Sequence, residues 1–306
     1  MPPAGKVRDP VRQDLELLQG AIDIHVHSGP DLYPRIQDHF ELARSAGEAG
    51  LRALVIKSHN FPTAARALMV RREVPGIDVF GSINLNLHVG GLNPIAVETA
   101  IKYGARQVWF PTVDSANHAS LVGGDVGQHG KGLVVAGGLS EYTRRHPRLR
   151  ILGSDGSLLP EVHEILRMIA EANIILNAGH ISYEEMERLV LAARAAGLRK
   201  ILVDHPFFSR ITLEQQEKLV AAGALINYTA GELLPRWWRV SVEDFAAGIR
   251  RIGVASAVLS SDAGQLHNPP PVEALRITVQ LLLEEGFTAE EIRTMLHTNP
   301  ARLLYD

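Results

Sequence analysis

The sequence predicts an α/β protein built as a (β/α)8 barrel, or TIM barrel, with a long excursion after the fourth strand. Short apolar runs rich in β-branched residues alternate with longer segments of helical periodicity, which is typical of a parallel sheet. There are about eight such runs, the number that closes a barrel. The expected strands are residues 21–27, 52–58, 77–86, 106–111, 173–178, 200–205, 224–228 and 257–262.

The chain before the first strand is a polar arm with a short amphipathic segment at 14–18. We therefore divide the sequence into an N-terminal arm and short helix, 1–20, and a single barrel domain, 21–306. The arm lacks the apolar core of a signal peptide, and no stretch approaches the roughly 20 apolar residues of a membrane span. We expect a cytoplasmic protein that does not contact a membrane.

Helix boundaries between the strands are marked by capping residues. Thr212 is the expected N-cap of a helix that stops at Gly223, and a helix after Ser182 stops at Gly197. Thr288 and Glu291 have the spacing of a capping box, so residues 288–304 are expected to form a closing helix.

The interval 113–159 is too long for a simple connection between a strand and a helix. It contains glycine pairs at 123–124 and 137–138 and a candidate extra strand at 132–136. We interpret it as an excursion over the active site.

Composition excludes several kinds of chemistry. The formal charge is −3 and no run of basic residues is present, so nucleic acid is not an expected partner. The sequence has no Cys, which excludes disulfides, a thiolate nucleophile and Cys-bound zinc. Any metal must therefore be held by some of the 13 His, by carboxylates or by a modified Lys.

Histidines gather where barrel enzymes place their active sites, at the carboxyl ends of the strands. The polar residues at these ends are His25, His27, Lys57, His59, His180, His205 and Asp262. Alternation along a strand puts His25 and His27 on one face, with Ile24 and Val26 on the other, so both rings can face one ion. The alternative is a pair of core histidines that only satisfy hydrogen bonds.

These residues resemble a known group of proteins. His25-Val26-His27, His180 after LNAG, His205 after ILVD, Asp262 after VLSS and the terminal NPARLL are similar to the amidohydrolase superfamily of metal-dependent barrel hydrolases. The resemblance covers most of the chain, from about residue 22 to 304. The phrases DIHVHSGPD and SSDAGQ are similar to a functionally uncharacterised branch of that superfamily, which names no substrate.

The resemblance implies a metal site and a reaction. His25, His27 and Asp262 would hold a buried divalent ion, and His180 and His205 a second one; Zn²⁺ is the first expectation and Mn²⁺ the second. Asp262 would take a proton from a metal-activated water and pass it to the leaving group of an amide, ester or lactone. One ion or two, and the oligomeric state, stay open.

The sequence departs from the superfamily at the fourth strand, where many two-metal members carry a carboxylated Lys or a Glu as a bridging ligand and RQVWFPT has neither. Lys57 is either a carboxylated bridge from the second strand or a cation that faces the substrate; we favour the cation. His59 is a metal ligand, a hydrogen-bond donor to the substrate, or a helix-start residue without chemical role.

Substrate contacts are expected from the loops after the strands. Arg35 and Arg239 are candidate partners for an anionic group, and Trp237 is a candidate apolar wall. The alternative is a surface loop whose tryptophans contact a second copy of the chain in a homo-oligomer. His118 and His129 in the excursion either cap the pocket or are solvated.

Other activities on the same barrel stay open. The same ions could support a decarboxylase, a deaminase or a hydratase acting on a small molecule, or the barrel could bind metal without turnover. Asp23 and Asp204, close to proposed ligands, either orient an imidazole or point away.

Overall fold

A computed structural model describes residues 12–123 and 140–306. Parallel strands form two sheets, one in the order β1-β2-β3 and one in the order β4-β5-β6-β7-β8-β9. The strands are β1 (Ile22–His27), β2 (Ala53–Lys57), β3 (Asp78–Phe80), β4 (Ser82–Asn84), β5 (Gln107–Trp109), β6 (Ile175–Asn177), β7 (Ile201–Asp204), β8 (Leu225–Thr229) and β9 (Ala257–Ser260).

The two sheets together form the predicted (β/α)8 barrel. The first and last strands meet through backbone hydrogen bonds from Asp262 N to His25 O, 2.8 Å, and from His27 N to Ala263 O, 2.9 Å. On the other side, β3 and β4 follow one another along the chain with only Gly81 between them. The expected strands are therefore confirmed, except that the run 77–86 is divided in two.

The division of this strand has a cause in the first turn of the helix after β2, α3 (Ala64–Glu73). A Cβ on Gly81 would lie 2.3 Å from the Ala64 backbone, so the helix start approaches the strand closely here. Thr63 also enters the ladder: its Oγ1 donates to Ile56 O at 2.6 Å and accepts from Ser82 N at 2.8 Å. A side chain thus replaces a direct backbone pair between β2 and β4.

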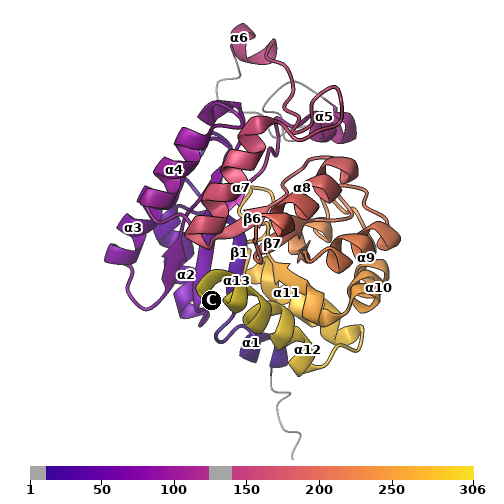
Figure 1. Cartoon of the computed structure of the whole chain (residues 1–306). Coiled ribbons are helices and arrows are strands. Elements are labelled where there is room, and N and C mark those ends of the chain that lie inside the picture. Colours follow the sequence, from indigo (N-terminus) through magenta and orange to yellow (C-terminus); the bar gives the residue numbers. More distant parts are fainter. Residues whose placement is uncertain (1–11, 124–139) are drawn as a thin grey trace, which may run out of the picture.

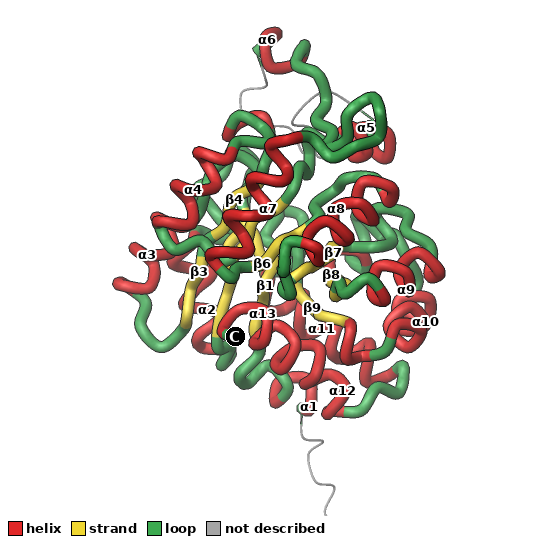
Figure 2. Tube along the Cα trace, viewed as in Figure 1, coloured by secondary structure: helices red, strands yellow, loops and turns green. Residues whose placement is uncertain are grey.

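Helices surround the strands (Figure 1; Figure 2). Before the excursion they are α1 (Gln13–Glu16), α2 (His39–Glu48), α3 (Ala64–Glu73), η1 (Leu87–Val89) and α4 (Pro94–Lys102). From the excursion on they are α5 (Ala116–Val122), α6 (Glu141–Arg144), α7 (Pro160–Ala172), α8 (Tyr183–Ala195), α9 (Leu213–Ala221), η2 (Ala230–Glu232), α10 (Val242–Ile252), η3 (Val254–Ser256), α11 (Pro271–Glu284), α12 (Ala289–Arg293), η4 (Thr294–Thr298) and α13 (Asn299–Tyr305). No helix of this described part is both long and apolar enough to cross a membrane.

The predicted helix starts are confirmed. Thr212, Ser182 and Thr288 each accept a hydrogen bond from the third helical residue and complete a capping box. The expected closing helix differs in one respect, because a π-helical turn, η4, separates α12 from α13. A π turn lies within a continuous helical coil, so a periodic pattern alone reads the whole segment as one helix.

The excursion after β5 contains two short helices, α5 and α6, which lie at one end of the barrel in Figure 1. Leu149 N donates to Asp114 O and Ala116 N to Leu149 O, both at 2.9 Å, so the returning chain is paired with the outgoing chain near β5. The candidate strand at 132–136 lies outside the described residues.

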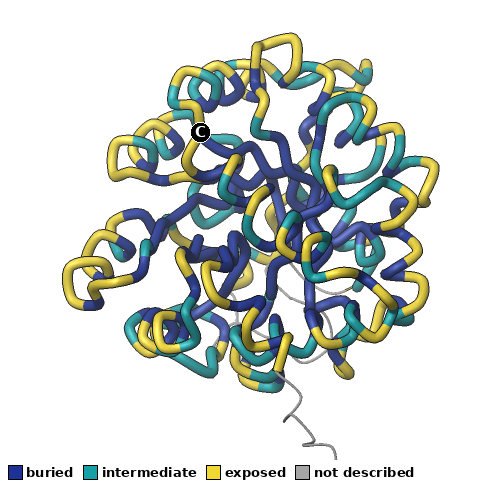
Figure 3. Tube along the Cα trace, turned by 90° about the horizontal axis from the view of Figure 1, so that it is seen from below, coloured by how far each residue is buried: buried dark blue, intermediate teal, exposed yellow. Residues whose placement is uncertain are grey.

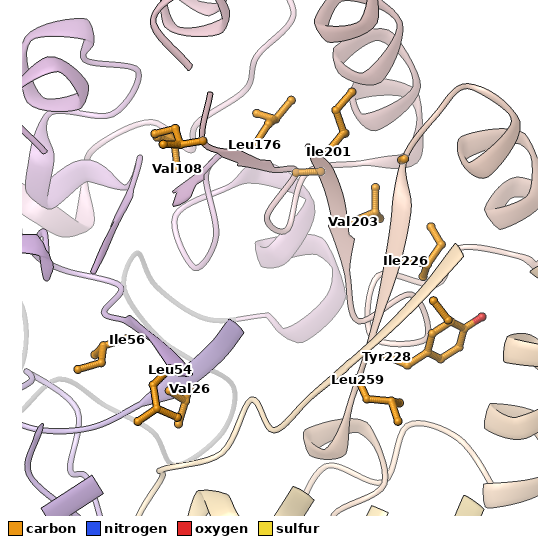
Figure 4. Close-up of a cluster of buried hydrophobic side chains, with 14 of the residues drawn as sticks. Val26, Leu54, Ile56, Val108, Leu176, Ile201, Val203, Ile226, Tyr228 and Leu259 are labelled. Carbon is orange, nitrogen blue, oxygen red and sulfur yellow. The ribbon is translucent and has the colours of Figure 1, made fainter. Parts of the chain in front are cut away.

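Buried apolar side chains form an outer and an inner cluster. The outer cluster packs between strands and helices and includes Val26, Leu54 and Ile56, which Figure 4 shows with residues of the later strands. The inner cluster fills the barrel and includes Ala53 and Val55, which alternate with them along β2. In the view from below, the buried chain lies at the centre and the exposed chain at the rim (Figure 3).

One expected face assignment is wrong. Ile24 belongs to the inner cluster and Val26 to the outer one, so these two residues do not share a face. The register between β1 and β2 shifts between Asp23 and Val26, and this irregularity breaks the strict alternation that the prediction assumed.

Candidate metal centre

The two ring nitrogens of His25 face two different carboxylates. Its Nδ1 lies 3.2 Å from Asp204 Oδ2, an oxygen that also accepts a 2.9 Å hydrogen bond from Trp109 Nε1. A carboxylate oxygen only accepts, so a hydrogen on Nδ1 can face Asp204, which leaves Nε2 as the candidate ligand atom. That Nε2 lies 3.0 Å from Asp262 Oδ1.

The surroundings of His25 favour positive charge. Burial lowers the pKa of the ring and Lys57 lowers it further, but Asp262 and Asp204 outweigh both and raise it to about 9. A group placed between two carboxylates therefore attracts a cation readily, whether that cation is a proton or a metal ion.

His27 has the same orientation as His25. Its Nδ1 lies 3.0 Å from the Lys57 carbonyl oxygen and its Nε2 lies 3.1 Å from Asp262 Oδ1. Burial, and then Arg35, hold the pKa of this ring well below its usual value, so the ring is neutral, as a metal ligand must be. Two imidazole Nε2 atoms thus converge on one carboxylate oxygen.

His205 completes a group that fits a metal ion. Ligand atoms of His25, His205 and Asp262 all lie within 4.8 Å of one another. Burial lowers the pKa of His205 to about 4, and its buried Nδ1 has no hydrogen-bond partner among the described residues. Imidazoles with one carboxylate are a donor set that suits Zn²⁺ and also Mn²⁺. The residues present therefore fit the ion.

Backbone strain occurs at two of these residues. His205 has a φ of +33° and Asp262 a φ of +45°, in the left-handed region that side chains rarely adopt. Each follows directly or closely on a strand end, where the chain must turn while the side chain still faces the barrel axis. Strain of this kind is typical of functional sites.

His180 lies beside this group. Its ring centroid is 4.7 Å from that of His205 and 6.2 Å from that of His59. The turn before it requires Gly179, which has a φ of +65° and where a Cβ would meet Phe110 O at 2.3 Å. The structure thus brings together the five residues that the sequence proposed as ligands: His25, His27, His180, His205 and Asp262.

His59 lies beside the same centre. Its Nδ1 is 3.0 Å from Thr112 Oγ1, an oxygen that also accepts a hydrogen bond from Asn86 Nδ2 at 2.7 Å. Its ring centroid is 5.1 Å from that of His27. Of the three roles considered for His59, this position is compatible with that of a metal ligand and with that of a donor to the substrate.

Lys57 lies inside the centre. Its Nζ is 2.9 Å from His25 Nε2 and 5.3 Å from the centroid of the Trp109 ring. The side chain is buried, and Asp204 and Asp262 are the charged groups that oppose the lowering of its pKa by burial. The carboxylates and the aromatic face make this a place for a cation.

The candidate substrate residues lie at the edge of the centre. Arg35 Nη2 is 3.0 Å from Asp31 Oδ2 and 3.2 Å from His27 Nδ1. Trp237 lies close to Gly231. A Cβ added at Gly231 would lie 3.2 Å from the Trp237 ring and 3.3 Å from Asp262 Oδ2. Arg239 is exposed and stacks on the Phe208 ring at 5.4 Å.

Residues that the sequence did not single out support the ligands. Phe208 contacts the rings of His180 and His205, with centroids 5.2 Å and 5.4 Å away. The buried Glu232 accepts 2.8 Å hydrogen bonds from the backbone nitrogens of Phe207 and Phe208. Burial raises the pKa of Glu232 to about 8. Its place in the loop shortly after β8, at the end of η2, was the signal available in the sequence.

The two acidic residues near the ligands differ in role. Asp204 orients the His25 ring, as described above. Asp23 Oδ1 instead accepts hydrogen bonds from the backbone nitrogens of His25, at 3.2 Å, and Ser261, at 3.1 Å. Asp23 therefore links the first strand of the barrel to the segment that follows the last strand. His129 lies outside the described residues.

Solved structures with the same barrel fold are similar to this chain over almost its whole length. An amidohydrolase from Pseudomonas aeruginosa is 13% identical, with a TM-score of 0.63 over 96% of this chain and 98% of that one. The probable dipeptidase PvdM from Pseudomonas aeruginosa is 11% identical, with a TM-score of 0.64 over 96% and 97%. The lactonase Lmo2620 from Listeria monocytogenes is 13% identical, with a TM-score of 0.60 over 95% of each chain.

The chain belongs to a protein family of unknown function, DUF6282, whose model matches residues 20–227. No curated protein sequence matches the chain.

Proposed function

We propose that this protein is a metal-dependent hydrolase that cleaves an amide, ester or lactone bond of a small molecule. One observation carries the proposal: the Nε2 atoms of His25 and His27 both lie within 3.1 Å of Asp262 Oδ1, while their Nδ1 atoms face Asp204 and the Lys57 carbonyl oxygen. Core histidines that only satisfied their own hydrogen bonds would not need to direct two rings at one carboxylate on a strained backbone.

The ligands proposed are His25, His27 and Asp262 for one divalent ion and His180 and His205 for a second, with zinc before manganese. A bound ion would lower the pKa of a water molecule and polarise the scissile carbonyl group. No side chain of the centre needs to act as a nucleophile.

Asp262 is the proposed proton shuttle. Burial would raise its pKa, but His25 and His27 hold that pKa well below its usual value, so the carboxylate is ionised. Its side chain keeps 14% of its surface exposed, whereas those of His25 and His27 are fully covered. Asp262 can therefore take a proton from the attacking water and later deliver it to the leaving group.

The other residues are proposed to bind and orient the substrate. His59 Nε2–H would donate to the carbonyl oxygen, and Lys57 would add positive charge beside it. Trp237 would supply an apolar wall, and Arg35 and Arg239 would attract an anionic group. A cytoplasmic location and assembly into a homo-oligomer remain predictions from composition and from the exposed Trp238.

The solved structures support the reaction class without fixing the bond. The proteins they describe include a lactonase and a probable dipeptidase, which act on a lactone and on a dipeptide respectively. Both are barrels of the same fold, so the proposal covers both bond types.

The test has two stages. Protein expressed with added zinc or manganese and purified without chelator is expected to hold one or two equivalents by elemental analysis, and His25→Ala with His27→Ala is expected to hold none. The loaded protein is then screened against lactones, N-acyl amino acids, carbamates and phosphoesters. Metal content well below one equivalent contradicts the metal centre. Full metal content with no hydrolysis of any panel member, but with loss of carbon dioxide from a free carboxylate or of ammonia from an amino-substituted ring, contradicts the reaction class.

A further inference from the structure

His180 is paired with a second histidine, His118 of α5. The two Nδ1 atoms are 2.8 Å apart, the ring planes differ by only 19° and the centroids are 4.9 Å apart. Both side chains are buried. The two rings therefore meet edge to edge, with one nitrogen facing the other.

This geometry is that of a hydrogen bond. Two nitrogen ligands of one tetrahedral zinc ion, each about 2.0–2.1 Å from the metal, lie roughly 3.3 Å apart and not head-on. A separation of 2.8 Å along the facing nitrogens leaves room for a hydrogen but not for an ion. His118 is therefore a partner of His180 rather than a fellow ligand.

The direction of the hydrogen bond decides what His180 can do. If His118 donated, the neutral His180 ring would carry its own hydrogen on Nε2 and could not bind a metal there. If His180 donates, its Nε2 keeps a lone pair. Only the second arrangement is compatible with His180 as a ligand.

The rest of α5 and the turn before it hold the His180 backbone. Ser115 Oγ donates to His180 O at 2.9 Å and Asn117 Nδ2 donates to the same oxygen at 3.1 Å. Ser115 Oγ also caps the helix by accepting from His118 N at 3.0 Å. Three side chains within four residues of the excursion thus fix both the backbone and the ring of one proposed ligand.

We propose that His118 is a positioning residue, which accepts a hydrogen bond from His180 Nδ1 and so keeps His180 Nε2 as a metal-binding nitrogen. This inference rests on the proposed function, since it assigns the support of one of its ligands. It also gives the excursion a role. The segment after β5, the strand that lacks a bridging ligand, supplies the residue that orients His180 after the next strand.

The first test measures the tautomer of His180 directly. In metal-free protein labelled at the imidazole nitrogens, long-range nitrogen–proton NMR is expected to show His180 protonated at Nδ1, its signals being those lost in His180→Gln. His118→Phe keeps a ring against Phe208 but has no acceptor, and His180 is expected to change to the Nε2-protonated form. His118→Asn places an amide oxygen near the former Nδ1 and is expected to keep the parent tautomer.

The second test measures zinc affinity by competition with a chromophoric chelator. Loss of a partner that orients a metal-bound imidazole typically weakens binding about 10–100-fold, and we expect this for His118→Phe, with His118→Asn near the parent. Thermal unfolding of both variants shows whether they fold alike.

Three results would overturn the inference: His180 protonated at Nε2 in the parent, an unchanged tautomer in His118→Phe, or unchanged zinc affinity in a folded His118→Phe. A parent protein that binds no zinc would contradict the proposed function, and with it the ligand role of His180. A parent protein that binds zinc but has His180 protonated at Nε2 would contradict only the present inference.

Discussion

At the scale of single residues, the centre is organised around Asp262. This residue receives two imidazole Nε2 atoms, has a strained backbone and is partly open to solvent. A structural ion needs ligands but no proton acceptor, so this partly exposed carboxylate is the part of the site that favours turnover over metal storage.

Asp262→Asn tests this separation of binding from proton transfer. The amide oxygen can still coordinate, but the amide cannot carry a proton, so turnover of a substrate found by screening is expected to fall about 10²–10⁴-fold. Metal content is expected to stay near that of the parent, because His25 and His27 are unchanged. Elemental analysis and steady-state kinetics on the same preparation measure both, and an unchanged kcat would remove Asp262 from the proton-transfer role.

Lys57→Met tests whether the second-strand lysine is a cation. Methionine keeps the apolar stem against Trp109 and removes the charge, so metal content should stay at the parent level. Loss of a charge-assisted contact of about 1.5–3 kcal/mol should lower kcat/KM roughly 10–150-fold.

The alternative for Lys57 is a carbamate. Protein loaded with metal in isotopically labelled bicarbonate should then give a carbamate carbon signal that Lys57→Met lacks, together with loss of metal in the variant. We expect neither result, because a carbamate would put a third negative charge next to Asp204 and Asp262.

The residues that carry the site differ in how far a sequence can predict them. His25 and His27 are two apart on one strand, so their shared direction follows from local geometry. The pair of His118 and His180 joins positions 62 apart, and the hydrogen bond from Trp109 to Asp204 joins positions 95 apart. Contacts of this range depend on how the barrel closes, which no local pattern encodes.

At the scale of elements, apolar runs locate the strands because each one is buried on both faces. Interruptions are harder to predict. The break at Gly81 arises from contact with the start of α3, and the irregularity in β1 arises from its pairing with β2. Both are properties of a strand's neighbours rather than of its own residues.

Gly81→Ala tests the close approach of α3 to the chain between β3 and β4. The new Cβ would meet backbone atoms of Ala64 at 2.3 Å, and rigid backbone cannot move aside as a side chain end can. We expect a loss of about 1–3 kcal/mol in the free energy of unfolding, measured by urea titration.

Gly47→Ala in α2 is the matched control. Its Cβ would find only Ile77 at 3.9 Å, so the gain in helix propensity should stabilise the protein by about 0.5–1 kcal/mol. Equal effects of the two substitutions would show that the approach at Gly81 is not tight.

At the scale of the whole molecule, the proposed ligands lie across the seam where the barrel closes. His25 and His27 are on the first strand and Asp262 follows the last one, and the seam itself is held by few backbone hydrogen bonds. An ion bound by these residues would therefore cross-link the beginning and the end of the barrel.

Metal binding should for this reason stabilise the entire fold. At a free zinc concentration 100 times the dissociation constant, the free energy of unfolding should rise by about 2.7 kcal/mol. For a chain of 306 residues, that corresponds to an increase of about 4 °C in Tm. Scanning calorimetry of chelator-treated protein with and without zinc measures the shift. The shift should vanish in His25→Ala and persist in His163→Ala, which removes an exposed histidine of α7. An equal shift in all three proteins would mean that zinc binds elsewhere and that the seam is not closed by a metal ion.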